Sequence, residues 1–72
     1  LDADHSVIEL KTPRSLAAQP AAVIERYGAR LLLIYRQGEL LPAPDADTEL
    51  REGDTLLTVG DREKLLALAS LP

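Results

Sequence analysis

Side chains that can act as nucleophiles or general bases are few and widely separated in this sequence. The only histidine, His5, lies near the start, whereas Ser15 and Ser70 are distant from it in sequence, and there is no cysteine. A self-contained hydrolytic site needs a nucleophile, a base that activates it and a group that stabilises the developing charge. The sequence does not supply this set. It therefore predicts a protein that is not an enzyme and has no catalytic residue.

One stretch of acidic residues has a spacing that is found in calcium-binding loops. Asp45, Asp47 and Glu49 alternate as oxygen ligands do. An EF-hand loop counted from Asp45 requires glycine at its sixth position and glutamate at its twelfth, and Leu50 and Leu56 stand there instead. We interpret the acids as part of a polar, proline-stiffened loop whose side chains bond to nearby backbone N–H groups, and we expect no metal site. Asp54 is expected to fix the next turn in the same way, and Leu50 is expected to enter the core between the two turns.

Phosphate-bearing cofactors and nucleic acids are not expected to bind through any known motif. The four glycines, Gly28, Gly38, Gly53 and Gly60, stand singly, so there is no glycine-rich phosphate loop. The formal net charge is -4 and the isoelectric point is about 4.8, whereas a nucleic-acid interface needs a basic patch. We predict no cofactor and no nucleic-acid partner.

Length and composition indicate one small domain with an aliphatic core. The chain has 72 residues, of which 46% are hydrophobic, but its only aromatic residues are Tyr27 and Tyr35. A domain of this size buries only about 60% of the surface that its unfolded chain exposes. Without cysteines, no disulfide can add stability. Aliphatic packing and self-association are the routes that remain.

The pattern of the chain predicts an α+β domain with the element order β-α-β-β-β-α. Residues 1–5 are expected to be a linker or frayed leader, and their two aspartates and histidine a solvated tail. Strands are predicted over residues 6–10, 31–35, 40–41 and 55–59. Ser15 can cap a short turn, Pro20 can begin a helix that runs to Tyr27, and Asp61 can cap a second helix. The expected sheet has four mostly antiparallel strands.

The strand predicted at residues 31–35 carries apolar side chains on both sides, so both faces of the sheet need to be covered. Leu31, Leu33 and Tyr35 are expected on one side of their strand, and Leu32 and Ile34 on the other. One interpretation is a central strand under two helices. The other, which we favour, is a homodimer that covers the surplus aliphatic surface, because most soluble self-assemblies have two-fold symmetry.

The second half of the chain resembles the TrkA C-terminal domain, also called the RCK C-lobe. The resemblance rests on Leu41 to Gly60, which contains Pro42, Pro44, Asp45 and the Gly53-Asp54-Thr55-Leu56 turn and strand. Upstream segments agree in order and spacing: Ser15-Leu16, Glu25-Arg26-Tyr27-Gly28, and Leu33-Ile34-Tyr35-Arg36 followed by Gly38. The match spans residues 6–71, which we take as the domain.

The resemblance implies a cytoplasmic regulatory domain of a potassium channel, a potassium uptake system or a cation/proton antiporter. Such domains are usually dimeric and are tethered to the inner face of the plasma membrane through the transporter, normally in the same polypeptide. Some members bind cyclic di-AMP at the dimer interface, near the end of the first helix and the following strand. Carried onto this chain, that region is Ile24, Tyr27, Gly28, Ala29 and Arg30.

The sequence differs from the family's effector-binding pattern at two places, and a second function is also considered. Ile24 and Ala29 stand where binders of cyclic di-AMP offer polar side chains, and Ala18-Gln19 replaces a Gly-Lys pair. Arg30 or Arg36 can meet an anionic effector, although arginines at strand ends are often solvated or paired on the surface. The alternative function is a ligand-free dimerisation or interaction module of a transporter or another multidomain protein.

Overall fold

The computed structural model describes residues 5–72, and its element order matches the predicted one. The strands are β1 (His5–Lys11), β2 (Ala29–Arg36), β3 (Glu39–Pro42) and β4 (Thr55–Asp61). The helices are α1 (Val23–Arg26) and α2 (Arg62–Ala69), with a short 3-10 turn at Arg14–Leu16. Aspartates 2 and 4 of the predicted leader lie outside the described residues.

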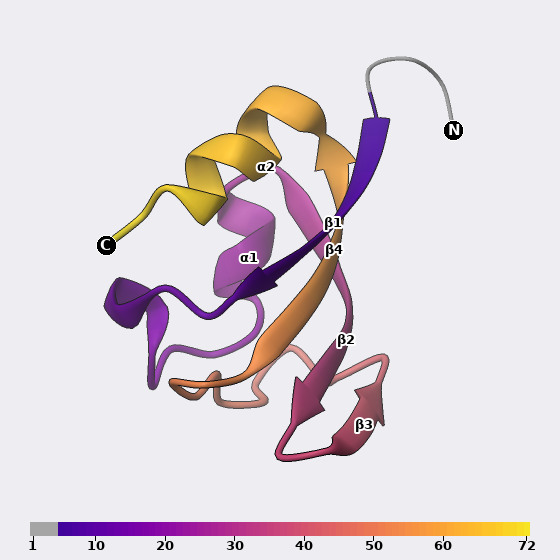
Figure 1. The fold of residues 1–72 in the computed structure, drawn as a ribbon, viewed down its shortest axis with the longest axis vertical. Coiled ribbons are helices and arrows are strands. Elements are labelled where there is room, and N and C mark those ends of the chain that lie inside the picture. Colours follow the sequence, from indigo (N-terminus) through magenta and orange to yellow (C-terminus); the bar gives the residue numbers. More distant parts are fainter. Residues whose placement is uncertain (1–4) are drawn as a thin grey trace.

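The four strands form one antiparallel sheet in the order β1-β4-β2-β3. Both helices lie on the same side of it (Figure 1), α2 against β1 and β4 and α1 against β2. The fold class predicted from the sequence is confirmed. Because β4 is the last strand but lies between β1 and β2, the sheet is complete only when both halves of the chain are in place.

The core lies between the sheet and the two helices. Its fully buried aliphatic side chains come from both helices, from β2 and β4, and from the loop before β4: Ile24, Ile34, Leu50, Leu56, Leu65 and Leu68. Leu50 was expected to enter the core between two turns, and it does. Thr58 is also buried, and its hydroxyl donates to the Ile8 carbonyl at 2.9 Å, so its polar atom is satisfied.

A β-bulge in β2 overturns the predicted sidedness of this strand. Leu31 pairs with Thr58 but Leu33 pairs with Leu57, so one extra residue is inserted between them. Leu31 therefore packs towards the core with Ile34, and Leu33 faces the opposite side. The strict alternation that we predicted is wrong, because a run of four similar aliphatic residues gives no local sign of a bulge.

The first helix is shorter than predicted. Pro20 does not begin a helix but forms an isolated bridge with Glu49, and α1 starts only at Val23. Ser15 does not cap a turn through its side chain; its backbone N–H donates to the Pro72 carbonyl at 2.8 Å. Asp61 does cap α2, with its side chain accepting from the backbone N–H groups of Glu63 and Lys64.

Gly60 lies inside β4, where β2 approaches it closely. A Cβ at this position would lie 3.0 Å from the Gly28 carbonyl oxygen and 3.3 Å from the Ala29 Cα. These backbone atoms belong to the first residue of β2 and to the residue before it, so they cannot move without shifting the strand. We expect Gly60→Ala to lower the free energy of unfolding by about 1–3 kcal/mol, measured by urea unfolding. Unchanged stability would contradict this account of the close approach.

Candidate functional site

A cavity of about 240 Å³ opens at the edge of β2, beside the start of α1. Its walls come from the segment that enters α1, from β2 and from the loop after β3: Ala21, Ala22, Glu25, Arg30, Leu31, Pro44 and Ala46. Most of these side chains are small or aliphatic, and only two carry charge. The cavity therefore combines short apolar walls with one cation and one anion.

The cavity exists because β3 covers only half of β2. The pairing of β3 with β2 runs from Leu33 to Arg36, and the chain then turns away at Ala43, whose N–H donates to the Leu32 carbonyl at 3.0 Å. Within residues 5–72, no strand pairs with the Ala29–Leu31 part of β2 on that side. This part of the strand is a free edge, and a free edge offers unpaired backbone groups to a ligand.

Backbone hydrogen bonds hold the loop after β3 against α1. The N–H of Ala21 donates to the Thr48 carbonyl at 2.7 Å, and that of Ala22 donates to the Ala46 carbonyl at 2.9 Å. Thr48 itself donates to the Asp45 carbonyl at 3.0 Å, which closes a turn in the loop. One wall of the cavity is thus fixed by contacts between segments more than 20 residues apart.

The structure separates the five residues that the resemblance singled out. Ile24 and Ala29 are buried in the core, and Tyr27 is half-buried against it. Gly28 ends α1 with a φ of 79°, a left-handed conformation that favours glycine, and its N–H donates to the Glu25 carbonyl. Only Arg30 lines the cavity.

The other lining residues were missed by the sequence analysis. Ala21, Ala22 and Glu25 were assigned to a helix, and Pro44 and Ala46 to a stiff polar loop. These two segments are brought together by the backbone hydrogen bonds of Ala21 and Ala22. Backbone hydrogen bonds do not require particular side chains, so the sequence shows no pattern that predicts them. The only available signal was the run of small residues around Pro20, which permits close approach of backbone to a ligand.

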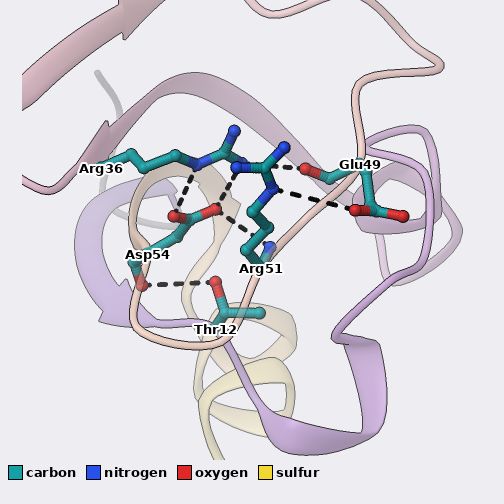
Figure 2. A network of polar contacts seen from close by, with 5 residues as sticks. All are labelled: Thr12, Arg36, Glu49, Arg51 and Asp54. Carbon is teal, nitrogen blue, oxygen red and sulfur yellow. Dashed lines mark hydrogen bonds and ion pairs between the residues drawn. The ribbon is translucent and has the colours of Figure 1, made fainter.

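A polar network fixes the end of β2 and the turn before β4 (Figure 2). The Arg36 guanidinium donates to both carboxylate oxygens of Asp54, at 2.9 and 2.8 Å, and also to the Glu49 carbonyl at 2.9 Å. Asp54 is only 2% exposed. The Arg51 N–H donates to the same carboxylate at 3.0 Å, as was predicted for a turn-forming aspartate. Thr12 donates through its N–H and its hydroxyl to the Asp54 carbonyl.

The network sets the charge states of its two central residues. Burial raises the pKa of Asp54. The hydrogen bonds from Arg36 and the Arg51 N–H, together with the charges of both arginines, lower it by more than burial raises it, so the pKa lies below its ordinary value. The hydrogen bond to Asp54 raises the pKa of Arg36. Arg36 therefore forms a structural ion pair with Asp54. Of the two arginines that were predicted to meet an anionic effector, only Arg30 lines the cavity.

Neither a cluster of metal ligands nor a membrane-spanning helix is found in the described part of the chain. Among residues 5–72, no three histidine, aspartate or glutamate side chains are grouped as a metal site would require. No helix there has the length and apolar character needed to cross a lipid bilayer.

Comparison with known proteins decides the family. The model of the TrkA-C domain matches residues 3–71 of the sequence. This chain belongs to the TrkA-C domain family. No curated protein matches the sequence.

Solved structures of TrkA-C relatives share the fold. The RCK C domain of the potassium transport protein KtrA in complex with cyclic di-AMP is 28% identical, with a TM-score of 0.80 over 90% of this chain and 80% of that one. A structure described as an RCK domain with cda is 26% identical, with a TM-score of 0.77 over 89% and 93% of the two chains. The GsuK channel bound to NAD is 21% identical, with a TM-score of 0.75, and this chain covers 13% of its length. The first match associates the TrkA-C fold with potassium transport.

Proposed function

We propose that this TrkA-C domain is a cytoplasmic regulatory module of a potassium channel, a potassium uptake system or a cation/proton antiporter. In this role the domain acts as a dimer, binds a small effector and passes a conformational change to a membrane protein in the same polypeptide. The effector class that fits best is a cyclic dinucleotide such as cyclic di-AMP, the ligand of the KtrA relative. The observation that carries the proposal is the cavity at the free edge of β2.

The chemistry of the cavity suits a nucleotide that carries both a phosphate and an amino group. Arg30 is exposed and can donate to a phosphate oxygen, and Glu25 is exposed and can accept from an exocyclic amine. The alanine walls let a flat base approach the free strand edge. At about 240 Å³ the cavity is smaller than the roughly 300–1,000 Å³ of typical small-molecule sites, so it would hold one part of a dinucleotide.

Regulation by such a ligand follows from differential affinity. A ligand shifts a conformational equilibrium only by the difference between its affinities for the two states. One wall of the cavity is a loop fixed by the Ala21 and Ala22 hydrogen bonds, and the other is β2, a central strand. A ligand that contacts both walls therefore favours states in which the loop is closed on α1.

Cyclic di-AMP at 100 times its dissociation constant is expected to raise the melting temperature of the domain by about 10–20 °C. Ligand at 100 times its dissociation constant adds about 2.7 kcal/mol, and in a domain of this size 1 kcal/mol shifts the melting temperature by about 4–8 °C. Arg30→Gln should abolish the shift while leaving the stability of the free domain within about 0.5 kcal/mol, because Arg30 is exposed.

The matched control is Arg26→Gln, which removes an exposed arginine on α1 outside the cavity. This variant should retain the full shift. Cyclic di-GMP, AMP and ATP serve as ligand controls. If none of these nucleotides changes the melting curve of the wild-type domain, the effector-binding proposal fails and the ligand-free interaction module takes its place.

A further inference from the structure

One row of the sheet places a cation and an aromatic ring on either side of a short side chain. Lys11 on β1 and Tyr35 on β2 both pair with Thr55 on β4, and paired residues of an antiparallel sheet share a face. The neighbouring row is buried on the helix side: Leu10, Leu56 and Ile34. Lys11, Thr55 and Tyr35 therefore lie on the opposite side of the sheet, away from both helices (Figure 1).

This row forms a trough, because its central side chain is the shortest of the three. Neighbouring strands lie about 4.8 Å apart, so the backbones of β1 and β2 are roughly 9.6 Å apart across β4. A cavity of about 380 Å³ fills the space between them, within the roughly 300–1,000 Å³ of typical small-molecule sites. Its lining residues are Lys11, Tyr35, Gln37, Gly38, Gly53 and Thr55. There is room over Thr55 for one flat ring beside the ring of Tyr35.

Two glycines keep one end of the trough open. A Cβ at Gly38 or Gly53 would meet no atom within 4 Å, so a ligand can approach the backbone closely there. Their φ angles of 80° and 93° are in the left-handed region, which favours glycine. In the described part of the chain, the backbone N–H groups of both residues donate to no acceptor. These two donors are therefore available to a ligand.

Lys11 is held in position and still has unused hydrogen-bond donors. Its ammonium donates to the Thr55 hydroxyl at 3.0 Å. An ammonium has three donors and a hydroxyl has one, so two N–H groups of Lys11 and the O–H of Thr55 remain for a ligand at the same point. Among residues 5–72, no carboxylate forms an ion pair with Lys11, and the nearby Glu52 pairs with Arg14 at 3.8 Å.

The chemistry of the trough selects a ligand with a flat ring and one negative charge. Of the described residues that line it, Lys11 alone is charged, and a carboxylate accepts strong hydrogen bonds from an ammonium. The side chain of Tyr35 is 48% exposed, so its ring can stack on an aromatic ligand. One cation in a chain of net charge -4 favours a carboxylate over a doubly charged phosphate.

We propose that the trough binds a small aromatic carboxylate, with the carboxylate at Lys11 and Thr55 and the ring stacked on Tyr35. This site is additional to the one in the proposed function. The two cavities lie near opposite ends of β2, at Arg30 and at Tyr35, and among the described residues they have no lining residue in common. Binding of an aromatic carboxylate therefore does not depend on binding of cyclic di-AMP.

Titration of the ¹⁵N-labelled chain with indole-3-acetate, followed by amide NMR at neutral pH, tests the site. A dissociation constant of about 1 mM is expected for a ligand of about 13 non-hydrogen atoms on an open surface. The amide signals of Gly38, Gly53 and Thr55 should shift and saturate. Indole-3-acetamide, which lacks the charge, and acetate, which lacks the ring, should each bind at least about tenfold more weakly. Absence of shifts at these three amides, or equal binding of indole-3-acetamide, overturns the proposal.

Two lysine variants separate recognition at the trough from general attraction between charges. Lys11→Gln should weaken binding of indole-3-acetate by at least about tenfold, because it removes the cation. Lys64→Gln is the matched control, since Lys64 is an exposed lysine on α2, on the other side of the sheet, and its affinity should be that of the wild type. Tyr35→Leu should weaken indole-3-acetate but not acetate. Equal affinities of the two lysine variants overturn the proposal, and so does a folded Tyr35→Leu variant with wild-type affinity for indole-3-acetate.

Discussion

Asp54→Asn is expected to lower the free energy of unfolding by about 3 kcal/mol, although residue 54 lies outside the candidate site. The reason is the Arg36 guanidinium, whose side chain is only 17% exposed and which donates to both oxygens of the 2% exposed carboxylate. Removing one member of a buried ion pair typically costs 3–5 kcal/mol, because the other charge is left without its partner. Urea unfolding followed by circular dichroism measures the loss.

Arg36→Met, combined with Asp54→Asn, completes a double-mutant cycle. The double variant should lose clearly less stability than the sum of the two single variants, since neither buried charge is then left alone. Asp47→Asn is the matched control, because Asp47 is exposed in the neighbouring loop, and its effect should stay within about 0.5 kcal/mol. If the double variant loses as much stability as the two single variants together, Arg36 and Asp54 do not stabilise each other and this account of the ion pair is wrong.

The same ion pair gives the stability of the domain a defined dependence on pH. The pKa of Asp54 is lower in the folded than in the unfolded chain, where an aspartate titrates near about 3.9. Above this pH, Asp54 is ionised in both the folded and the unfolded chain, and the ion pair makes its full contribution to the free energy of unfolding. As the pH falls below it, Asp54 of the unfolded chain takes up a proton first, so this contribution decreases until the pH reaches the pKa of the folded chain. The stability difference between wild type and Asp54→Asn should therefore be greatest above about pH 5 and shrink below about pH 4.

Local signals in the sequence predicted most of the secondary structure. The Asp61 cap, the Asp54 turn and the burial of Leu50 each follow from one residue type in a short context, and all three are present. The bulge at Leu32 was not predictable, because each neighbour is also aliphatic. The late start of α1 was not predictable either, because Pro20, the expected first residue of the helix, pairs instead with Glu49 from a distant segment.

The candidate site was predicted only in outline. The resemblance indicated the end of the first helix and the following strand, and Arg30 there lines the cavity. Ile24 and Ala29, which the resemblance placed at the effector site, are instead buried in the core. The position of the loop at Pro44 and Ala46 could not be predicted, because backbone hydrogen bonds bring this loop to the start of α1. Sites at a free strand edge depend on where a neighbouring strand ends, and no single residue encodes that point.

Leu50→Ala should lower the free energy of unfolding by about 2–5 kcal/mol. Leu50 is fully buried, and it joins the loop that forms the cavity wall to the core. Its N–H donates to the Gln19 carbonyl at 2.8 Å, and its carbonyl accepts from Ala18 at 2.7 Å. The lost side chain leaves a cavity in the core beside the loop. Since small domains are stable by only about 5–15 kcal/mol, a measurable unfolded fraction is expected near physiological temperature.

Leu66→Ala is the control that shows whether the effect of Leu50→Ala comes from the burial of the side chain or from the leucine-to-alanine change alone. Leu66 undergoes the same substitution on α2, but it is 52% exposed, and alanine favours the helix, so the change should stay within about 0.5 kcal/mol. The Leu50 variant should also bind cyclic di-AMP more weakly than its loss of stability predicts, because the loop wall is no longer held in place. Calorimetry at a temperature where both variants are folded measures this affinity. Equal affinities would mean that the loop after β3 takes no part in effector binding.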